Sequence, residues 1–434
     1  MRKLDKLIEW LFYLFLFLLP WQTRLIIKDG ILNGGYWEWG TISFFAIDLV
    51  FIMISLFFCC RVIFTDQTEN GRLPKKMMFF VLLFLTFSFV SIFWAENRVI
   101  SFYHWLRLLE GVFLFIFIQK INFSIVRAGW SLVLAGLVQI SLALVQFINQ
   151  NVFSSKWLGI AAQNVFQVGV SVVETAEGRI LRLYGSFSHP NIFAGYLVFL
   201  IFVLFVLYFS SKNFWQKNLI LFISSLATMT LYFTFSRAAW ISLLINLILL
   251  VIFIFKKAAK NFRTPFFEFF GLVLIIFVMF SVLTARDFLV RIEARGRLEN
   301  ISVKERMLNF DRGQEIVKKN FLLGVGLGNY SWELFKKYPN LTSWDYQPIA
   351  NIYLLILAEL GLVGLLLFLS MVLFVFLRLG FNVHTPILAS LLFVGLFDHW
   401  LFSLSFGILL FYLALGLLWK RYQPHEVTGE ENIF

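Results

Sequence analysis

The sequence predicts an all-α, polytopic integral membrane protein with about 12 transmembrane helices and one large helical extracytoplasmic loop. Hydrophobic residues make up 60% of the chain and charged residues only 14%, far below the quarter that is usual in soluble domains. Apolar runs of about twenty residues recur without period-two alternation, which selects helices rather than barrel strands for crossing a bilayer. One long polar interval, residues 286–350, interrupts these runs and predicts the large loop.

Twelve apolar runs are predicted as transmembrane spans. They cover residues 7–27, 40–60, 77–95, 101–119, 125–147, 192–210, 218–235, 238–255, 266–284, 351–377, 384–397 and 399–419. The first run follows Arg2, Lys3 and Lys6 as a signal peptide would, but it lacks a small-residue cleavage site and leads into Pro20 and Trp21. We therefore expect it to be retained as the first span.

Lysine and arginine residues gather in alternate loops between the predicted spans. With a cytoplasmic N-terminus, seventeen of them fall in the inner loops and only four in the short outer loops. The four are Arg24, Lys28, Arg98 and Arg237. The positive-inside rule therefore predicts a multi-pass protein with both termini in the cytoplasm. The net charge of +12 is explained by membrane orientation, so no nucleic-acid partner is expected.

This orientation divides the chain into four parts. Residues 1–285 hold the first nine spans with an outer loop at 148–191, residues 286–350 form the large outer loop, residues 351–419 hold the last three spans, and residues 420–434 form a cytoplasmic tail.

The large outer loop contains two predicted helices. Ser302 and Glu305 have the spacing of a capping box, which predicts a helix from there to about Lys319. A shorter helix is predicted near residues 331–338, ending at Pro339.

Two arginines stand where predicted spans meet outer loops. Arg237 opens a span in FSRAAW, and Arg182 lies in LRLYGSFSHPN ahead of the sixth span. Each arginine either extends to the lipid headgroups or binds an anion through parallel guanidinium hydrogen bonds. After Arg182, His189 and Asn191 flank Pro190, which suits a first helical turn. His189 is either a structural partner of that turn or a proton carrier.

A second group of arginines leads into the large-loop helix. Its members are Arg286, Arg291, Arg295, Arg297 and Arg306. Most of them are expected on a solvated helix face, paired with glutamates four residues away. Because arginine outnumbers lysine here, one or two of these residues are expected to bind phosphate.

Ionisable residues inside predicted spans are functional candidates, because a charge in hydrocarbon is costly. They are Asp48, Arg107, Glu110, Glu359, Asp398 and His399. Arg107 and Glu110, three residues apart, either neutralise each other or belong to a proton relay such as a transporter would use. The five histidines have no ligand spacing, so no metal site is expected.

Several segments taken together resemble the O-antigen ligase and O-antigen polymerase family. They are RLYGSFSHPN (182–191), SRAAW (236–240), SVKER (302–306), FLLGVGLGNY (321–330), NIYLLILAELGLVG (351–364) and LFDHW (396–400). The resemblance implies a membrane glycosyltransferase of the C-type fold in the cytoplasmic (inner) membrane, acting on its outer face without a metal or other cofactor. Its partners would be membrane lipids, a glycan on undecaprenyl pyrophosphate, and a lipid or glycan acceptor.

The resemblance also implies roles for individual residues. Arg237 and Arg306 match arginines that stabilise the departing pyrophosphate, and Arg182 is a third candidate for this role. The residues expected to bind substrate are Arg182, His189, Asn191, Asn351, Tyr353 and Glu359.

The family pattern before the tenth span reads His-Asn-x-Tyr-Leu, and its histidine is the proposed general base. This chain has Ala350 at that position, and an alanine cannot accept a proton. Three explanations remain: an engineered inactive variant, a natural homologue that uses another base, or a homologue that binds without catalysing. The conceivable substitutes for the base are Asp345, Glu359 and His189.

We therefore expect an O-antigen ligase-like glycosyltransferase. A polymerase of the same family would differ in its acceptor rather than in these residues. A flippase or transporter for a lipid-linked saccharide would depend instead on the buried charges Asp48, Arg107 and Glu110. A non-catalytic homologue that binds lipid-linked glycan is the remaining alternative, and Ala350 favours it.

Overall fold

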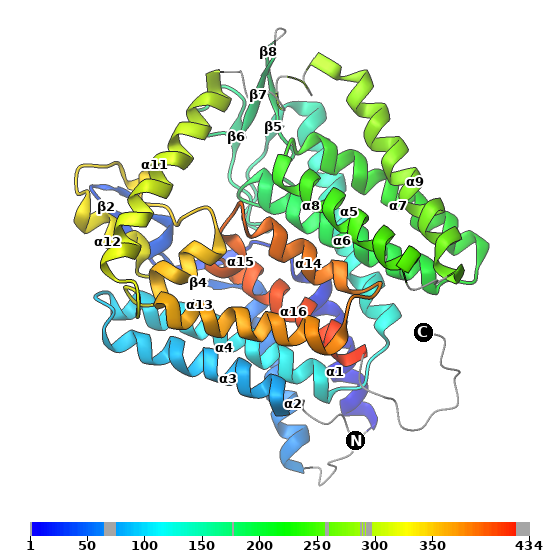
Figure 1. Ribbon diagram of the computed structural model, residues 1–434, viewed down its shortest axis with the longest axis horizontal. Helices are drawn as coiled ribbons and strands as arrows, with labels where there is room; N and C mark the ends of the chain where they lie inside the picture. Colours follow the sequence, from blue (N-terminus) through cyan, green and yellow to red (C-terminus); the bar gives the residue numbers. More distant parts are fainter. Residues whose placement is uncertain are drawn as a thin grey trace.

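A computed structural model describes residues 2–64, 75–175, 178–256, 260–286, 289, 291 and 297–421. The chain is mostly helical, as predicted (Figure 1). Its helices are α1 (Arg2–Leu18), α2 (Ala46–Phe64), α3 (Lys75–Val90), α4 (Arg98–Lys120), α5 (Ile125–Asn149), α6 (Pro190–Ser210), α7 (Phe214–Phe233), α8 (Arg237–Lys256), α9 (Lys260–Leu283), α11 (Arg297–Lys319), α12 (Tyr330–Lys337), α13 (Ile352–Leu379), α14 (Thr385–Val394), α15 (Trp400–Ser403) and α16 (Ser405–Arg421). Three 3-10 turns are η1 (Glu38–Gly40), η2 (Ser91–Phe93) and η3 (Ser343–Asp345).

The prediction of a purely helical chain was incomplete, because four small antiparallel sheets connect the helices. They pair β1 (Arg24–Lys28) with β4 (Ile42–Phe45), β2 (Ile31–Leu32) with β3 (Gly35–Tyr36), β5 (Asn151–Val152) with β6 (Gln163–Asn164), and β7 (Val172–Thr175) with β8 (Gly178–Leu181). In Figure 1 most of these sheets lie with α11 and α12 at one end of the long helices.

Two predicted span boundaries were wrong: the end of the first span, predicted at residue 27, and the start of the second span, predicted at residue 40. Residues 24–27 and 42–45 are paired strands, so α1 ends at Leu18 and α2 begins only at Ala46. Pro20 favours this end, because the residue before a proline is disfavoured in the helical conformation. The strands contain β-branched and aromatic residues, which suit a sheet as well as an apolar helix.

Among the described residues, eight helices are long and apolar enough to cross a membrane. They are Ala46–Phe64, Lys75–Phe93, Arg98–Lys120, Ile125–Asn149, Pro190–Ser210, Arg237–Phe255, Phe262–Leu283 and Ile352–Leu379. The predicted spans 384–397 and 399–419 are shorter helices instead. Helix α14 has 10 residues, and Leu404, which is extended, separates the short α15 from α16.

In the large loop, the predicted helix ends at Lys319 as expected, but α11 already begins at Arg297. Ser302 therefore lies inside the helix and is no N-cap. The predicted second helix is confirmed as α12. Some loop residues lie outside the described part of the chain, among them Arg295, and so do residues 422–434 of the predicted tail.

Helix α6 is the centre of one half of the fold. It is almost completely buried and packs against α5, α7, α8, α9 and α14. In the other half, α4 packs along α16 and α3 packs along α13. Gly111 permits the α4–α16 approach, because a Cβ atom there would lie 2.3 Å from a ring carbon of Tyr412. Small residues let helices in a membrane approach this closely.

The first and last helices are both attached to the connection between α4 and α5. The Tyr13 hydroxyl in α1 accepts a hydrogen bond from the Ser124 amide before α5, at 2.9 Å. Lys420, near the end of α16, donates to the carbonyls of Ile118 and Ile121 at the end of α4. The helices α6, α8 and α13 begin at the opposite end of the bundle, where the candidate site lies.

Candidate functional site

Arg182 follows strand β8 directly and is buried, and two hydrogen bonds fix its guanidinium group. Its Nε donates to the carbonyl of Thr234 at 2.7 Å, and its Nη2 donates to the side-chain oxygen of Asn191 at 2.8 Å. Thr234 ends α7, and Asn191 lies in the first turn of α6. Arg182 therefore joins the ends of two helices. A side chain held in this way does not extend to the lipid headgroups.

His189 caps the start of α6. Its Nδ1 accepts the amide hydrogen of Asn191 at 3.1 Å, and its Nε2 lies 3.0 Å from the Ser171 hydroxyl. Burial lowers the pKa of His189 to about 3, with further lowering by the charge of Arg182 and of Arg306, while Asp398 opposes the shift. The ring is therefore neutral at physiological pH. Because Nδ1 accepts a hydrogen bond, Nε2 carries the ring hydrogen and donates a hydrogen bond to the Ser171 hydroxyl.

Asp398 extends this polar chain beyond Asn191. One oxygen of its carboxylate accepts from the side-chain nitrogen of Asn191 at 3.4 Å, and the other accepts from the amide of His399 at 2.8 Å. Asp398 is half-buried, and the preceding Leu396 and Phe397 are exposed. The carboxylate thus lies at an open edge of the fold. The sequence marked Asp398 only as an intramembrane charge, since Asn191 is 207 residues away.

The start of α13 lies at the same edge. Asn351 caps this helix, with its side-chain oxygen accepting from the amides of Tyr353 and Leu354. Its side-chain nitrogen donates to the carbonyl of Leu396 at 2.9 Å. Ala350, which precedes the cap, is half-buried. Since Leu396 stands two residues before Asp398, the fold brings the Ala350 segment and the Asp398 carboxylate together.

Two predicted site residues point elsewhere. The Tyr353 hydroxyl donates to the carbonyl of Leu392 at 2.9 Å, which ties α13 to α14. Glu359 lies two turns further along α13, is buried, and accepts the amide hydrogen of Gly328 at 2.7 Å. Neither side chain contacts the Arg182–Asn191–Asp398 chain through a hydrogen bond among those the structure gives.

Two more arginines approach the turn between α7 and α8. Arg237 is the first residue of α8 and is half-buried. The Nε of Arg291 donates to the carbonyl of Phe235 at 2.8 Å. A solvated helix face was favoured for Arg291, but its side chain is bound to this turn. The expected partners of that face include Glu293, which lies outside the described residues.

Arg306 lies on α11 with its side chain exposed. It lies close enough to His189 for its charge to contribute to the low pKa of that ring. The start of α11 is attached to strand β7, because Arg297 forms an ion pair with Glu174 at 2.8 Å. Arg182 and Arg291 thus bind the two sides of the α7–α8 turn that Arg237 follows, and Arg182 is linked through Asn191 to Asp398. Several guanidinium groups suit a ligand with more than one negative charge.

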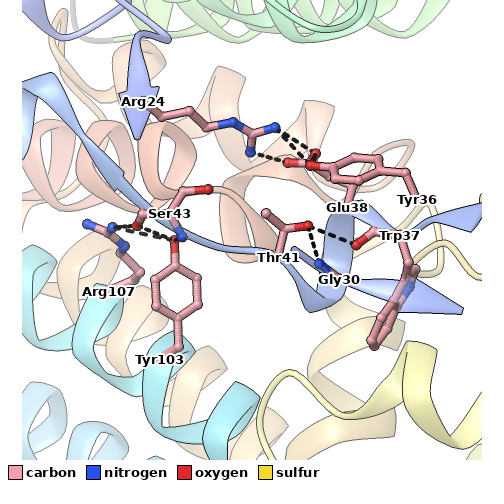
Figure 2. Close-up of polar contacts among 9 residues, drawn as sticks. All are labelled: Arg24, Gly30, Tyr36, Trp37, Glu38, Thr41, Ser43, Tyr103 and Arg107. Atoms are coloured by element: carbon pink, nitrogen blue, oxygen red, sulfur yellow. Dashed lines mark hydrogen bonds and ion pairs between the residues drawn. The ribbon is translucent and has the colours of Figure 1, made fainter. Parts of the chain in front are cut away.

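A separate charged cluster lies within the bundle. Arg107 donates to Asp48 at 2.8 Å and to Glu110 at 2.9 Å. Its Nη2 also donates to the carbonyl of Ser43 at 2.7 Å (Figure 2). The i,i+3 pairing with Glu110 was one of the two predicted roles for these residues, whereas Asp48 was not predicted as a partner of Arg107. In the described part of the chain, no three His, Cys, Asp or Glu side chains form a group that could hold a metal ion.

Residues 219–369 match a family model described as O-antigen ligase. These residues are here called the O-antigen ligase domain. The resemblance in the sequence is therefore confirmed. No curated protein matches the chain.

The O-antigen ligase domain contains only part of the candidate site. Arg237, Arg306 and Ala350 lie within the matched residues, whereas Arg182 and Asp398 lie outside them. The hydrogen bonds of Arg182 to Thr234 and of Asn351 to Leu396 connect the two sets.

A glycine-rich loop of the O-antigen ligase domain, residues 321–330, is inserted into a break in α13. Gly361 has a φ of 67° and interrupts the helix. The carbonyl of Glu359 accepts from the amide of Gly326 at 2.8 Å, and the carbonyl of Phe321 accepts from the amide of Leu362 at 2.8 Å. Gly324 has a φ of 71°, which favours glycine. The loop thus satisfies backbone groups that the break in α13 would leave unpaired.

Proposed function

We propose that this protein is a membrane glycosyltransferase that moves a glycan from undecaprenyl pyrophosphate to a lipid or glycan acceptor. The O-antigen ligase domain supports a ligase- or polymerase-type activity. The observation that carries the proposal is the hydrogen-bonded link from the buried Arg182 through Asn191 to the half-buried carboxylate of Asp398, with Arg306 close enough to His189 for its charge to lower the pKa of that ring. The protein acts on the outer face of the cytoplasmic membrane with both termini inside, which the distribution of basic residues supports.

In this reaction the acceptor hydroxyl forms a bond to the anomeric carbon of the donor sugar. The bond from that carbon to the phosphate oxygen breaks, and the pyrophosphate leaves with the electron pair. Arg237 and Arg306 stabilise the developing negative charge, with Arg182 as the buried third arginine. Guanidinium groups suit this role because each can hold two phosphate oxygens at once. The proposed reaction uses no metal.

The acceptor proton requires a base other than Ala350. Among the conceivable substitutes, Asp345 is occupied in a capping box with Thr342, and Glu359 holds Gly328 inside the fold. His189 uses Nδ1 for the Asn191 amide. Asp398 also accepts two hydrogen bonds, but its carboxylate is half-buried beside the Ala350 segment and its contact with Asn191 is long, at 3.4 Å. We therefore assign the general-base role to Asp398 because of its position.

The test is transfer of a labelled glycan from undecaprenyl pyrophosphate to a mixed acceptor extract, together with equilibrium binding of the donor. Arg237→Ala and Arg306→Ala should each weaken donor binding at least tenfold, whereas Arg98→Ala should not. Arg98 is a matched control, because it is an exposed arginine that begins α4. Unchanged donor affinity in both site variants would remove the arginine assignment.

The same assay distinguishes the possible bases. Asp398→Asn should abolish transfer while donor binding persists. If Ala350→His transfers glycan and the unsubstituted protein does not, the missing base belongs at position 350 and the Asp398 assignment is wrong. If neither protein transfers glycan although both bind the donor, the chain is a non-catalytic binder or a transporter.

A further inference from the structure

The segment between α1 and α2, residues 24–45, forms a compact double hairpin, here called the N-terminal hairpin. Arg24 and Glu38 hold it together through two parallel hydrogen bonds of 2.5 and 2.8 Å, and the Tyr36 hydroxyl donates to the same carboxylate at 2.8 Å (Figure 2). Burial raises the pKa of the Glu38 carboxyl, but its bonds to Arg24 and Tyr36 outweigh this and lower the pKa overall. The pair is therefore charged at physiological pH.

The N-terminal hairpin is fixed to the helices beneath it. The Thr41 hydroxyl donates to the carbonyl of Trp37 at 3.0 Å and accepts from the amide of Gly30 at 3.1 Å. The carbonyl of Ser43 accepts from Arg107 and, at 3.0 Å, from the Tyr103 hydroxyl, both of which lie on α4 (Figure 2). Such a network leaves the hairpin little freedom to move as a unit.

The N-terminal hairpin also holds the segment that leads to Ala350. The Asn33 side chain donates to the carbonyls of Pro339 and Leu341 at 2.6 and 2.7 Å. The Trp37 indole donates to the carbonyl of Tyr346 at 3.2 Å. The hairpin thus forms a wall beside the candidate site, although it lies far outside the O-antigen ligase domain in the sequence.

Trp39 lies in the turn η1 of this wall and reaches the site itself. Its ring contacts the ring of His399 edge-on, with centroids 4.9 Å apart and an interplanar angle of 85°. His399 is joined to Asp398 through its amide. Trp39 is only half-buried, so part of its indole remains open. The contacts run from Arg182 through Asn191 and Asp398 to His399 and then Trp39.

This order places the carboxylate between the arginines and the indole. If the arginines hold the donor pyrophosphate and Asp398 receives the acceptor proton, the acceptor glycan extends toward Trp39. A pyranose ring has a face of C–H groups, and the electron-rich face of an indole attracts such groups while burying apolar area. The two residues before Trp39, Trp37 and Glu38, are both fixed by hydrogen bonds, so the ring is preorganised.

We propose that Trp39 is a sugar-binding platform on which a pyranose ring of the acceptor glycan stacks, and that it helps to select the acceptor. This inference rests on the proposed glycosyl transfer for the identity of the ligand. It assigns an acceptor-binding role to the N-terminal hairpin, which the family match does not cover.

The experiment measures binding of a mixture of deacylated, fluorescently labelled cell-envelope glycans to the detergent-solubilised full-length protein. Trp39→Ala should weaken glycan binding about tenfold, which corresponds to about 1.4 kcal/mol. Trp39→Phe, which keeps an aromatic face, should restore most of the affinity. Trp157→Ala is the matched control, because Trp157 is a tryptophan 87% exposed in the predicted outer loop 148–191.

Donor binding and thermal unfolding are measured on the same variants. Donor affinity should stay unchanged in Trp39→Ala, whereas a merely structural role would lower donor affinity and stability together. The inference is overturned if Trp39→Ala binds the glycans as tightly as Trp157→Ala, if donor and glycan binding fall equally, or if the unsubstituted protein binds no glycan. Selective loss of glycan binding without transfer by any variant would support the platform and contradict the proposed function.

Discussion

The side-chain oxygen of Asn191 accepts a hydrogen bond from Nη2 of Arg182 at 2.8 Å, deep in the fold and at the start of helix α6. The same amide donates to Asp398, so one asparagine sets the distance between a buried cation and an anion at an open edge. A neutral amide can serve both neighbours because it has donors and acceptors at once. The following predictions start from this contact.

Asn191→Ala should misplace Arg182 and weaken donor binding about tenfold, because the guanidinium loses a buried acceptor. Equilibrium binding of the undecaprenyl-pyrophosphate glycan measures the effect. Asn149→Ala is the control, since Asn149 is exposed at the end of α5 and donates only to its own helix, at Val145. Equal donor affinities in the two variants would show that Arg182 does not contribute to donor binding through this contact.

Glu359→Ala should lower the free energy of unfolding by about 1–3 kcal/mol, because the buried amide of Gly328 loses its acceptor. Glu359→Gln should be much milder, since the amide oxygen can still accept that hydrogen bond. Thermal unfolding in detergent compares the two, with Glu315→Ala as an exposed control. If Glu359→Gln unfolds normally but loses donor affinity, Glu359 binds substrate, as the family resemblance implies, rather than positioning the loop.

Arg107→Ala should destabilise the protein by about 3–5 kcal/mol, because Asp48 and Glu110 would remain inside the bundle without their common partner. The double variant Arg107→Met, Asp48→Leu should recover part of this loss, since it removes one stranded charge. Unfolding midpoints measure both, and Arg98→Ala on the same helix serves as the control. A single variant as stable as the control would mean that the cluster contributes little.

Acidification should destabilise the protein partly through His189. Its folded pKa of about 3 lies below the ordinary value of 6.5, so the folded state binds fewer protons than the unfolded state between these values. The contribution of His189 to stability is complete above pH 6.5 and falls as the pH drops toward 3, by at most about 1.4 kcal/mol per pH unit.

His189→Asn tests this pH dependence, because asparagine keeps an acceptor for the capping bond but does not titrate. The unfolding midpoint of the variant should fall less than that of the unsubstituted protein between pH 7 and pH 5. Parallel loss of stability in both proteins would assign the acid sensitivity to other groups.

Particular elements show how far the sequence alone could go. Pro190 in the first turn after His189 predicted the start of α6, and the structure confirms it. Pro339 predicted the end of α12 to within two residues. By contrast, strands β1 and β4 were assigned to helical spans, because an apolar run of β-branched and aromatic residues is compatible with either structure.

The sequence by itself determined the membrane class, most of the helices and the resemblance to the O-antigen ligase family that the match of residues 219–369 supports. These features are local, since a membrane helix satisfies its backbone hydrogen bonds within one segment and its apolar length can be read directly. Only the tertiary structure joined Asn191 to Asp398 and placed Trp39 against His399. Those contacts link residues hundreds of positions apart, and helix packing rather than local propensity brings them together.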